Sequence, residues 1–285
     1  MTSDPLSLQE IQQANLSALV EIDRICRENR LRYFLAYGTL IGAVRHHGFI
    51  PWDDDVDIFM PRKDYDALHK ILGDGIVNGF KLCTRANTKH YPYYIPRFCN
   101  MRYRYETEQK EPIFDIGAFV DIYPLDNYCS DMEHGRKLVR RIRRMNATYM
   151  LYNKGAIGKN GLVRAASSVA SILLHLAEGK KFPERINGRI DRFLLANTSD
   201  QDTYVGVPAW TYGLTQYDRE LFDENTELPF EGHLLSVPKE YDAVLSKLYG
   251  DYMALPPEEE RKATHHYSMY VRDGSIENNS FGRTE

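Results

Sequence analysis

The sequence is poor in the features that mark secreted and membrane-spanning proteins. It has only four cysteines in 285 residues, and none of them are spaced as zinc ligands or as a compact disulfide framework would be. No uninterrupted apolar run reaches the roughly 18–20 residues that a membrane-spanning helix needs. The N-terminus also lacks a basic segment followed by an apolar one. These absences predict a cytoplasmic protein with reduced thiols.

The chain also lacks an excess of positive charge. Its formal net charge is −4, which argues against a nucleic-acid-binding protein with a wholly basic surface. Positive charge is nevertheless concentrated locally, with six lysines and arginines between residues 136 and 144. The length predicts one main domain with appended parts, and 43% hydrophobic residues are ample for its core.

The most informative stretch runs from residue 37 to 61, YGTLIGAVRHHGFIPWDDDVDIFMP. It begins with a glycine-containing turn and ends in an acidic cluster. Carboxylates alternate with apolar residues from Asp55 to Phe59, which predicts a strand with Asp55 and Asp57 on one face. Two adjacent carboxylates repel each other unless a cation lies between them, and Mg²⁺ prefers such ligands. The alternative is a solvated acidic turn.

A third carboxylate, Asp121, lies in a second apolar strand predicted at residues 115–123. Burying a carboxylate on such a strand is costly without a partner. If this strand lies beside the one that carries Asp55 and Asp57, all three carboxylates could share one metal cluster.

Other segments show clear periodicity. Apolar spacing predicts helices at residues 6–30, 62–72 and 183–197, the first starting at Ser3 or Asp4 before Pro5. Short strands are predicted at residues 80–83 and 97–103. Residues 162–177 form a strongly apolar helix after the basic run. This pair of helices is either an ordinary buried helix beside a solvated basic one, or a surface that docks onto anionic lipid or a lipid-linked acceptor.

Three blocks carry a family resemblance: GTLIGAVRHHGFIPWDDDVDI, FVDIYPLD and VPKEYDAVLSKLYGDYMALPP. Together they span roughly residues 30–267. They resemble the LicD family of phosphotransferases, which includes bacterial phosphorylcholine transferases and is related to fukutin-type ribitol-phosphate transferases. The resemblance implies an α+β fold, with a nucleotidyltransferase-like mixed β-sheet core flanked by helices and an added helical segment. We expect a catalytic core at 1–129, a helical and partly basic segment at 130–200, and a C-terminal part at 201–285 that completes the active site and core.

The resemblance also implies roles for individual residues. The catalytic residues and metal ligands would be Asp55, Asp57 and Asp121, with Mg²⁺ or Mn²⁺ as the cofactor. Residues that would bind substrate are Gly38 and Thr39 at a phosphate-binding turn, Arg45 as a phosphate clamp, and also Trp52, Asp53, Asp54 and His265. Two of these roles have alternatives: Arg45 could form an ion pair with Asp53 or Asp54, and His265 could be a surface histidine.

The activity implied is transfer of phosphorylcholine from CDP-choline to a hydroxyl of a cell-surface glycan precursor, of the teichoic acid or lipopolysaccharide type, with release of CMP. The acceptor would be a glycan or lipid-linked glycan, and the protein could contact the inner face of the cell membrane peripherally. Nucleic acid is not expected as a partner. The alternatives are a donor such as CDP-ribitol, CDP-glycerol or a nucleoside triphosphate, and a non-catalytic member that binds a nucleotide or glycan.

Overall fold

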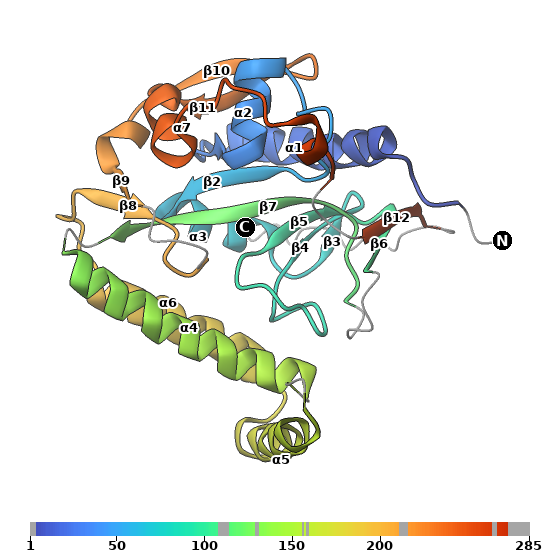
Figure 1. Ribbon diagram of the computed structural model, residues 1–285, viewed down its shortest axis with the longest axis vertical. Helices are drawn as coiled ribbons and strands as arrows, with labels where there is room; N and C mark the ends of the chain where they lie inside the picture. Colours follow the sequence, from blue (N-terminus) through green and yellow to red (C-terminus); the bar gives the residue numbers. More distant parts are fainter. Residues whose placement is uncertain are drawn as a thin grey trace, which may run out of the picture.

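The structure is a computed structural model that describes residues 4–107, 114–128, 131–155, 157, 160–210, 216–263 and 267–272. Figure 1 shows a mixed β-sheet with helices packed against it and a helical projection that extends away from the sheet. The predicted α+β fold is confirmed. In the described part of the chain the helices are α1 (Leu8–Asn29), α2 (Tyr37–His46), α3 (Arg62–Leu72), α4 (Met132–Lys154), α5 (Gly161–Glu178), α6 (Phe182–Asn197) and α7 (Tyr241–Tyr249).

The main sheet has the strand order β1-β2-β7-β5-β4-β3. Its strands are β1 (Phe34–Leu35), β2 (Asp57–Pro61), β3 (Ile76–Val77), β4 (Phe80–Cys83), β5 (Arg97–Asn100) and β7 (Ala118–Tyr128). Strands β2 and β7 run parallel, and their neighbours pair with them antiparallel. The far end of β7 pairs with β8 (Tyr204–Gly206), which pairs with β9 (Gln216–Asp218). Separate ladders join β10 (Asn225–Phe230) to β11 (His233–Pro238), and β12 (Tyr267–Val271) to β6 (Tyr103–Thr107).

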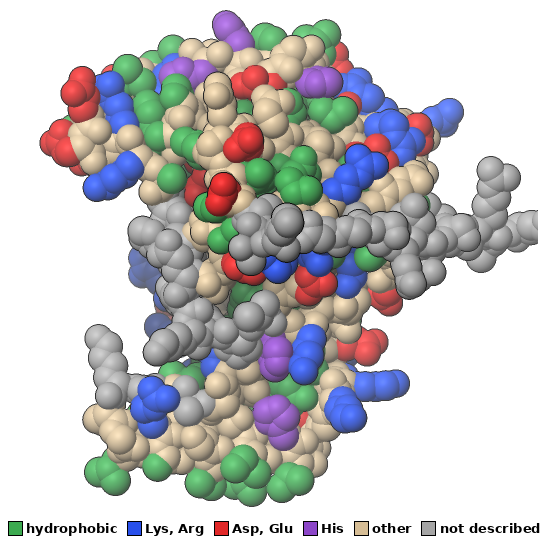
Figure 2. Space-filling view, turned by 90° about the vertical axis from the view of Figure 1, so that its right-hand side faces the viewer, with side chains coloured by type: hydrophobic (Ala, Val, Ile, Leu, Met, Phe, Trp, Pro, Cys, Tyr) green, Lys and Arg blue, Asp and Glu red, His purple; other side chains and the backbone are tan. Residues whose placement is uncertain are grey.

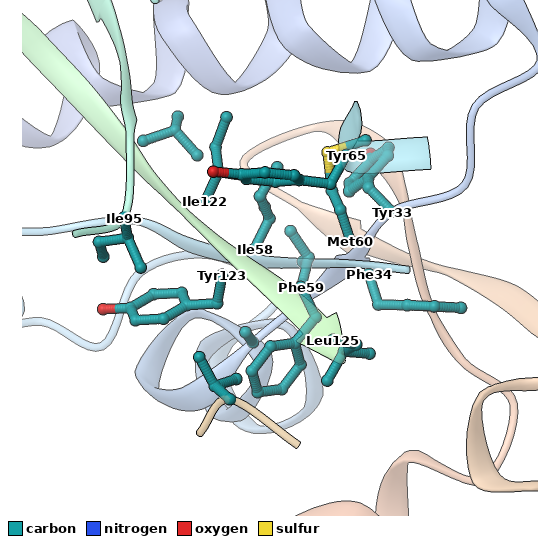
Figure 3. Packing of buried hydrophobic residues seen from close by; sticks show 14 of the residues in the cluster. Tyr33, Phe34, Ile58, Phe59, Met60, Tyr65, Ile95, Ile122, Tyr123 and Leu125 are labelled. Carbon is teal, nitrogen blue, oxygen red and sulfur yellow. The ribbon is translucent and has the colours of Figure 1, made fainter. Parts of the chain in front are cut away.

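The parallel pair at the centre of the sheet is buried on both faces. Figure 3 shows Phe59 and Tyr123 on one side of these strands, and Ile58, Met60 and Ile122 on the other. Such double burial is typical of parallel strands, which helices cover on both faces. A polar side chain on either strand is therefore removed from water unless an opening or a partner is provided.

Helix α1 begins at a different residue from the one predicted. Its N-cap is Ser7, whose hydroxyl accepts a hydrogen bond from the Glu10 amide while the Glu10 carboxylate accepts one from the Ser7 amide. This reciprocal capping box satisfies two amides that the helix itself cannot, and it places the start after Pro5.

The other local predictions held to different degrees. Helix α3 covers residues 62–72 as predicted and ends at Gly73, which has a positive φ of 59°. The single strand predicted at 97–103 is wrong. Strand β5 ends at Asn100, whose side-chain oxygen accepts a hydrogen bond from the Arg102 amide at 3.1 Å, and this turn separates it from β6.

The helical projection consists of α4, α5 and α6. Helices α4 and α6 pack along each other, and α5 packs on α4 at the end far from the sheet. The interpretation of residues 162–177 as an ordinary buried helix is wrong, because most of the large apolar side chains of α5 are exposed. Among the described residues, no helix combines the length and apolar character needed to cross a membrane.

Candidate active site

Two aspartates lie side by side on the central parallel strands. Asp57 is the first residue of β2, and the register places it directly opposite Asp121 of β7. Residues that are opposite in neighbouring strands point to the same face of a sheet. The strand with Asp121 therefore does lie beside the one with Asp57, as the prediction of a shared cluster required. The Asp57 amide donates to the Thr39 hydroxyl at 2.9 Å, which fixes the start of β2 against α2.

The Asp57 carboxylate is buried and short of partners. Its Oδ1 atom has no hydrogen-bond partner in the described structure. Burial raises the pKa of Asp57 well above its ordinary value, and the nearby charges of Asp55, Asp121 and Asp53 raise it further. The Tyr123 hydroxyl, two residues beyond Asp121 on the same face, acts in the opposite direction. A buried carboxylate in this situation is stabilised either by a proton or by a cation.

Asp121 has a counter-ion of its own. Arg97, opposite it on β5, donates to both carboxylate oxygens, at 2.7 Å and 3.1 Å. Both side chains are buried, and the guanidinium lies over the rings of Phe119 and Tyr93, 3.9 Å and 4.4 Å from their centroids. An ionised carboxylate offers about four lone-pair sites, so this bidentate contact leaves sites for a cation. Arg97 was not predicted as a site residue; an arginine within an apolar strand is the signal that could have revealed it.

The acidic loop before β2 brings three further carboxylates together. One oxygen each from Asp53, Asp54 and Asp55 lies within 4.8 Å of the others. Among the described residues, these three are the acidic group whose oxygens are close enough to share a metal ion. Asp55, Asp57 and Asp121 do not form such a group. The expectation that Asp55 lies in the strand is wrong, because β2 begins two residues later. Asp55 therefore reaches the site from the loop.

Helix α1 holds this loop in place through buried polar side chains. The Gln12 amide group donates to the carbonyl of Asp53 at 2.9 Å, and the Asn15 amide group donates to that of Asp54 at 3.0 Å. The Asn15 side-chain oxygen also accepts from the Phe119 amide of β7 at 2.8 Å. Asn15 thus ties the acidic loop to the strand that carries the third acid. These residues were also missed, although polar residues inside an apolar helical stripe are a readable signal.

Gly38 and Thr39 lie in the first turn of α2, and not in a turn before the helix as predicted. A Cβ atom at Gly38 would lie 2.7 Å from Oδ2 of Asp53, which is closer than real Cβ contacts. A side chain at position 38 would therefore displace the Asp53 carboxylate, which approaches the helix closely here.

Arg45 extends toward the C-terminal part of the chain. It donates to the carbonyls of Tyr252 and Ala254, at 3.0 Å and 3.3 Å. It makes no ion pair with any residue that the structure describes, so the alternative of a pair with Asp53 or Asp54 is wrong. Partial burial and the neighbouring charge of Arg261 lower the pKa of Arg45.

Arg261, which the sequence did not reveal, lies close enough to Arg45 for its charge to act on it. Its guanidinium lies 5.8 Å from the ring centroid of Trp52, the residue before Asp53. Arg45, Arg261 and Trp52 therefore lie together next to the acidic loop, and we call these three residues the positive rim. Of the predicted site residues, His265 lies outside the described residues.

Comparisons with known proteins agree with this arrangement. Residues 30–150 match the family described as LicD/FKTN/FKRP, nucleotidyltransferase domain. Over 272 residues the chain is 27% identical to the lipopolysaccharide cholinephosphotransferase LicD of Haemophilus influenzae, covering 93% of this chain and 98% of that protein. Shorter matches are 49% identity over 45 residues to an uncharacterized protein of Rickettsia prowazekii, and 37% over 68 residues to one of Rickettsia typhi. The first covers 16% of this chain and 17% of its relative, and the second 24% and 20%.

The domain match and the acid-bearing parallel strands define a phosphotransferase with a nucleotidyltransferase domain, the class of enzyme that the sequence predicted. Within that class, residues 30–150 match the LicD/FKTN/FKRP domain, and nearly the whole chain is similar to a LicD cholinephosphotransferase, as its motifs indicated.

Proposed function

We propose that this enzyme transfers phosphorylcholine from CDP-choline to a hydroxyl of a cell-surface glycan precursor and releases CMP. The single observation that carries the proposal is the buried Asp57 carboxylate, which faces Asp121 beside an acidic loop and lacks a partner for one oxygen. The choice of donor and acceptor is supported by the Haemophilus relative, whose name states a cholinephosphotransferase acting on lipopolysaccharide. A teichoic acid precursor is the other acceptor type that we include.

The acids fit a divalent cation, Mg²⁺ or Mn²⁺. Asp55, Asp57 and Asp121 would hold it, because Asp57 Oδ1 has no protein partner in the described structure and all three are acceptors that hard cations prefer. When bound, such an ion would neutralise the charge of the donor phosphates. The remaining carboxylates of the acidic loop, those of Asp53 and Asp54, would position the ion or the donor.

The positive rim suits the diphosphate of the donor. Arg45 and Arg261 repel each other when no anion is present, and that repulsion is relieved when a phosphate lies between them. Trp52 would present its aromatic ring to the donor beside these cations. A quaternary ammonium forms no hydrogen bonds, so choline is recognised by aromatic surfaces of this kind.

In the reaction, the acceptor hydroxyl attacks the phosphorus that bears choline. A new phosphorus–oxygen bond forms, the bond to CMP breaks, and the acceptor proton passes to a carboxylate of the site or to water. The contact with Arg97 fixes the orientation of Asp121, which suits Asp121 for holding an ion. If the glycan is attached to a lipid, the hydroxyl is presented near a membrane, so we include peripheral contact with an anionic membrane surface in the proposal.

The test is CMP release from CDP-choline by purified protein with a glycan acceptor fraction, in Mg²⁺ or in EDTA. We expect metal-dependent release by the wild type, and a loss of at least about 100-fold in Asp57→Asn. Asp223→Asn is a matched control, since Asp223 is exposed at the end of a short 3₁₀ helix. Release from CDP-ribitol or CDP-glycerol alone would replace the donor, and no release from any of the three would refute the proposal.

A further inference from the structure

Helix α5 presents apolar side chains to the outside. Leu162 is 87% exposed and Leu176 is 78% exposed. They share a face with Leu173 and Val169, since these positions recur at intervals of three, four and seven residues. Other exposed apolar residues of the helix are Val163 and Ile172. Figure 2 shows hydrophobic side chains along the lower edge of the molecule, where α5 lies in Figure 1.

The polar side of the same helix faces the protein. Ser171 is the residue of α5 that is fully buried. The His175 ring stacks on the ring of Tyr152 of α4, with ring centroids 3.8 Å apart. Glu178 pairs with two arginines of α6, Arg185 and Arg189, each at 3.0 Å. A surface helix of a soluble protein normally buries its apolar face and exposes its polar one. Helix α5 departs from this rule, because only Leu174 of its large apolar side chains packs partly against the core and the others are exposed.

The region around α5 is strongly positive, unlike the rest of the chain. Residues 131–200 contain fourteen lysines and arginines and six acidic residues, a formal net charge of +8 within a chain of −4. Lys180 and Lys181 follow α5 directly and are exposed. The basic side chains of α4 between residues 136 and 144 are exposed as well.

We infer that α5 is a membrane-docking helix, which lies in the surface of an anionic bilayer with its apolar face among the lipid chains. Net positive charge attracts the region to anionic headgroups, and the exposed leucines then enter the boundary between headgroups and chains. The same charge would repel a second copy of this region, which argues against self-association through α5. This inference deepens the peripheral contact in the proposed function and assigns it to one helix, with α4 and α6 above the membrane.

Vesicle binding tests the inference directly. The full chain is mixed with vesicles of phosphatidylglycerol and phosphatidylcholine, or of phosphatidylcholine alone, and sedimented. We expect sedimentation with the anionic vesicles, less of it at high salt, and binding reduced at least about tenfold in Leu173→Gln/Leu176→Gln. The matched control is Leu195→Gln/Leu234→Gln, whose leucines are exposed to a similar degree, 61% and 59%, but lie on α6 near its C-terminal end and on β11. This control should bind as the wild type does.

Three results would overturn the inference: wild-type protein that stays in the supernatant, an α5 variant that binds as well as the wild type, or a dimer in size-exclusion chromatography that only the α5 variant converts to monomer. The last would make the apolar face of α5 a contact between copies. CMP release without vesicles, measured on the same proteins with a water-soluble acceptor, separates this inference from the proposed function. It should be unchanged in the α5 variant, and its absence in the wild type would count against the catalytic proposal alone.

Discussion

The substitution Asp57→Asn should stabilise the metal-free protein while it removes activity. Asn has nearly the same shape as Asp, but it brings no negative charge to a buried position beside Asp55, Asp121 and Asp53. A buried polar atom without a partner costs about 1–3 kcal/mol, and a charged one costs more. For a protein of this size, each kcal/mol corresponds to roughly 2–4 °C in melting temperature. We therefore expect Asp57→Asn to melt several degrees above the wild type in EDTA.

The pH dependence of this difference follows from the direction of the pKa shift. Burial and the neighbouring acids raise the pKa of Asp57 above its ordinary value of 3.8. Below that value the group is neutral in the folded and unfolded chains, so its charge costs nothing. As the pH rises above it, the unfolded chain loses the proton first and the folded state is destabilised relative to it. The advantage of Asn should be smallest near about pH 4 and largest near about pH 8.

Thermal melts across this range, with and without Mg²⁺, measure the effect, and Asp223→Asn serves as the control. Mg²⁺ should raise the melting temperature of the wild type and of the control, but not that of Asp57→Asn, because only proteins with the intact site bind the ion tightly. A variant less stable than the wild type at about pH 8 in EDTA would refute the reasoning, since Asp57 would then have a compensating partner in the metal-free fold.

Three further substitutions test the supports of the site. Arg97→Met should lower the free energy of unfolding by about 3–5 kcal/mol in urea denaturation, because the buried Asp121 carboxylate loses its counter-ion. Gly38→Ala should slow CMP release by at least about tenfold, because the new methyl group would displace the Asp53 carboxylate from its place in the site. Thr39→Val should lower the free energy of unfolding by about 1–2 kcal/mol, because it removes the acceptor of the first amide of β2.

Each of these has a control of the same chemistry elsewhere in the chain. Arg102→Met changes an exposed arginine and should leave stability within about 0.5 kcal/mol. Gly188→Ala lies in α6 with only the end of a flexible arginine 3.7 Å away, and Thr148→Val lies on an exposed turn of α4. Equal effects in a test variant and its control would show that the contact assigned to the site residue is not responsible.

Local sequence patterns predicted the acidic residues of the site, but not the residues that hold them in place. The alternation around Asp57 and Asp121 marks each strand by itself, because period-two spacing is a property of a few consecutive residues. The contacts of Arg97 and Asn15 join residues 24 and 104 positions apart, so they depend on which strands pair and in which register. The α1 start at Ser7 was readable, since a serine three residues before a glutamate is a capping signature, but the proline nearby outweighed it in the prediction.

The contact with Arg97 also explains why Asp57 and Asp121 differ in how their charges are balanced. Asp121 is neutralised by Arg97 within the fold, so it needs no ion in order to be buried. Asp57 has no such counter-ion among the described residues, and its charge must be balanced by a proton or by something that binds. Occupancy of the site is therefore coupled to the ionisation of Asp57, while Asp121 supplies a fixed, oriented carboxylate beside it.

If α5 docks on a membrane as inferred, the path of the chain from this site to α5 would set where the chemistry takes place relative to that membrane. Strand β7 carries Asp121, and α4 follows it with 23 residues, about 35 Å of helix at 1.5 Å per residue. Figure 1 shows α4 slanting from the sheet to α5 at the far end of the projection. If α5 lies in the bilayer surface, the acids stand above the headgroups, so a lipid's own headgroup does not reach them. For an enzyme that docks in this way, we would expect the acceptor hydroxyl to be held away from the membrane by several sugar units of a lipid-linked glycan.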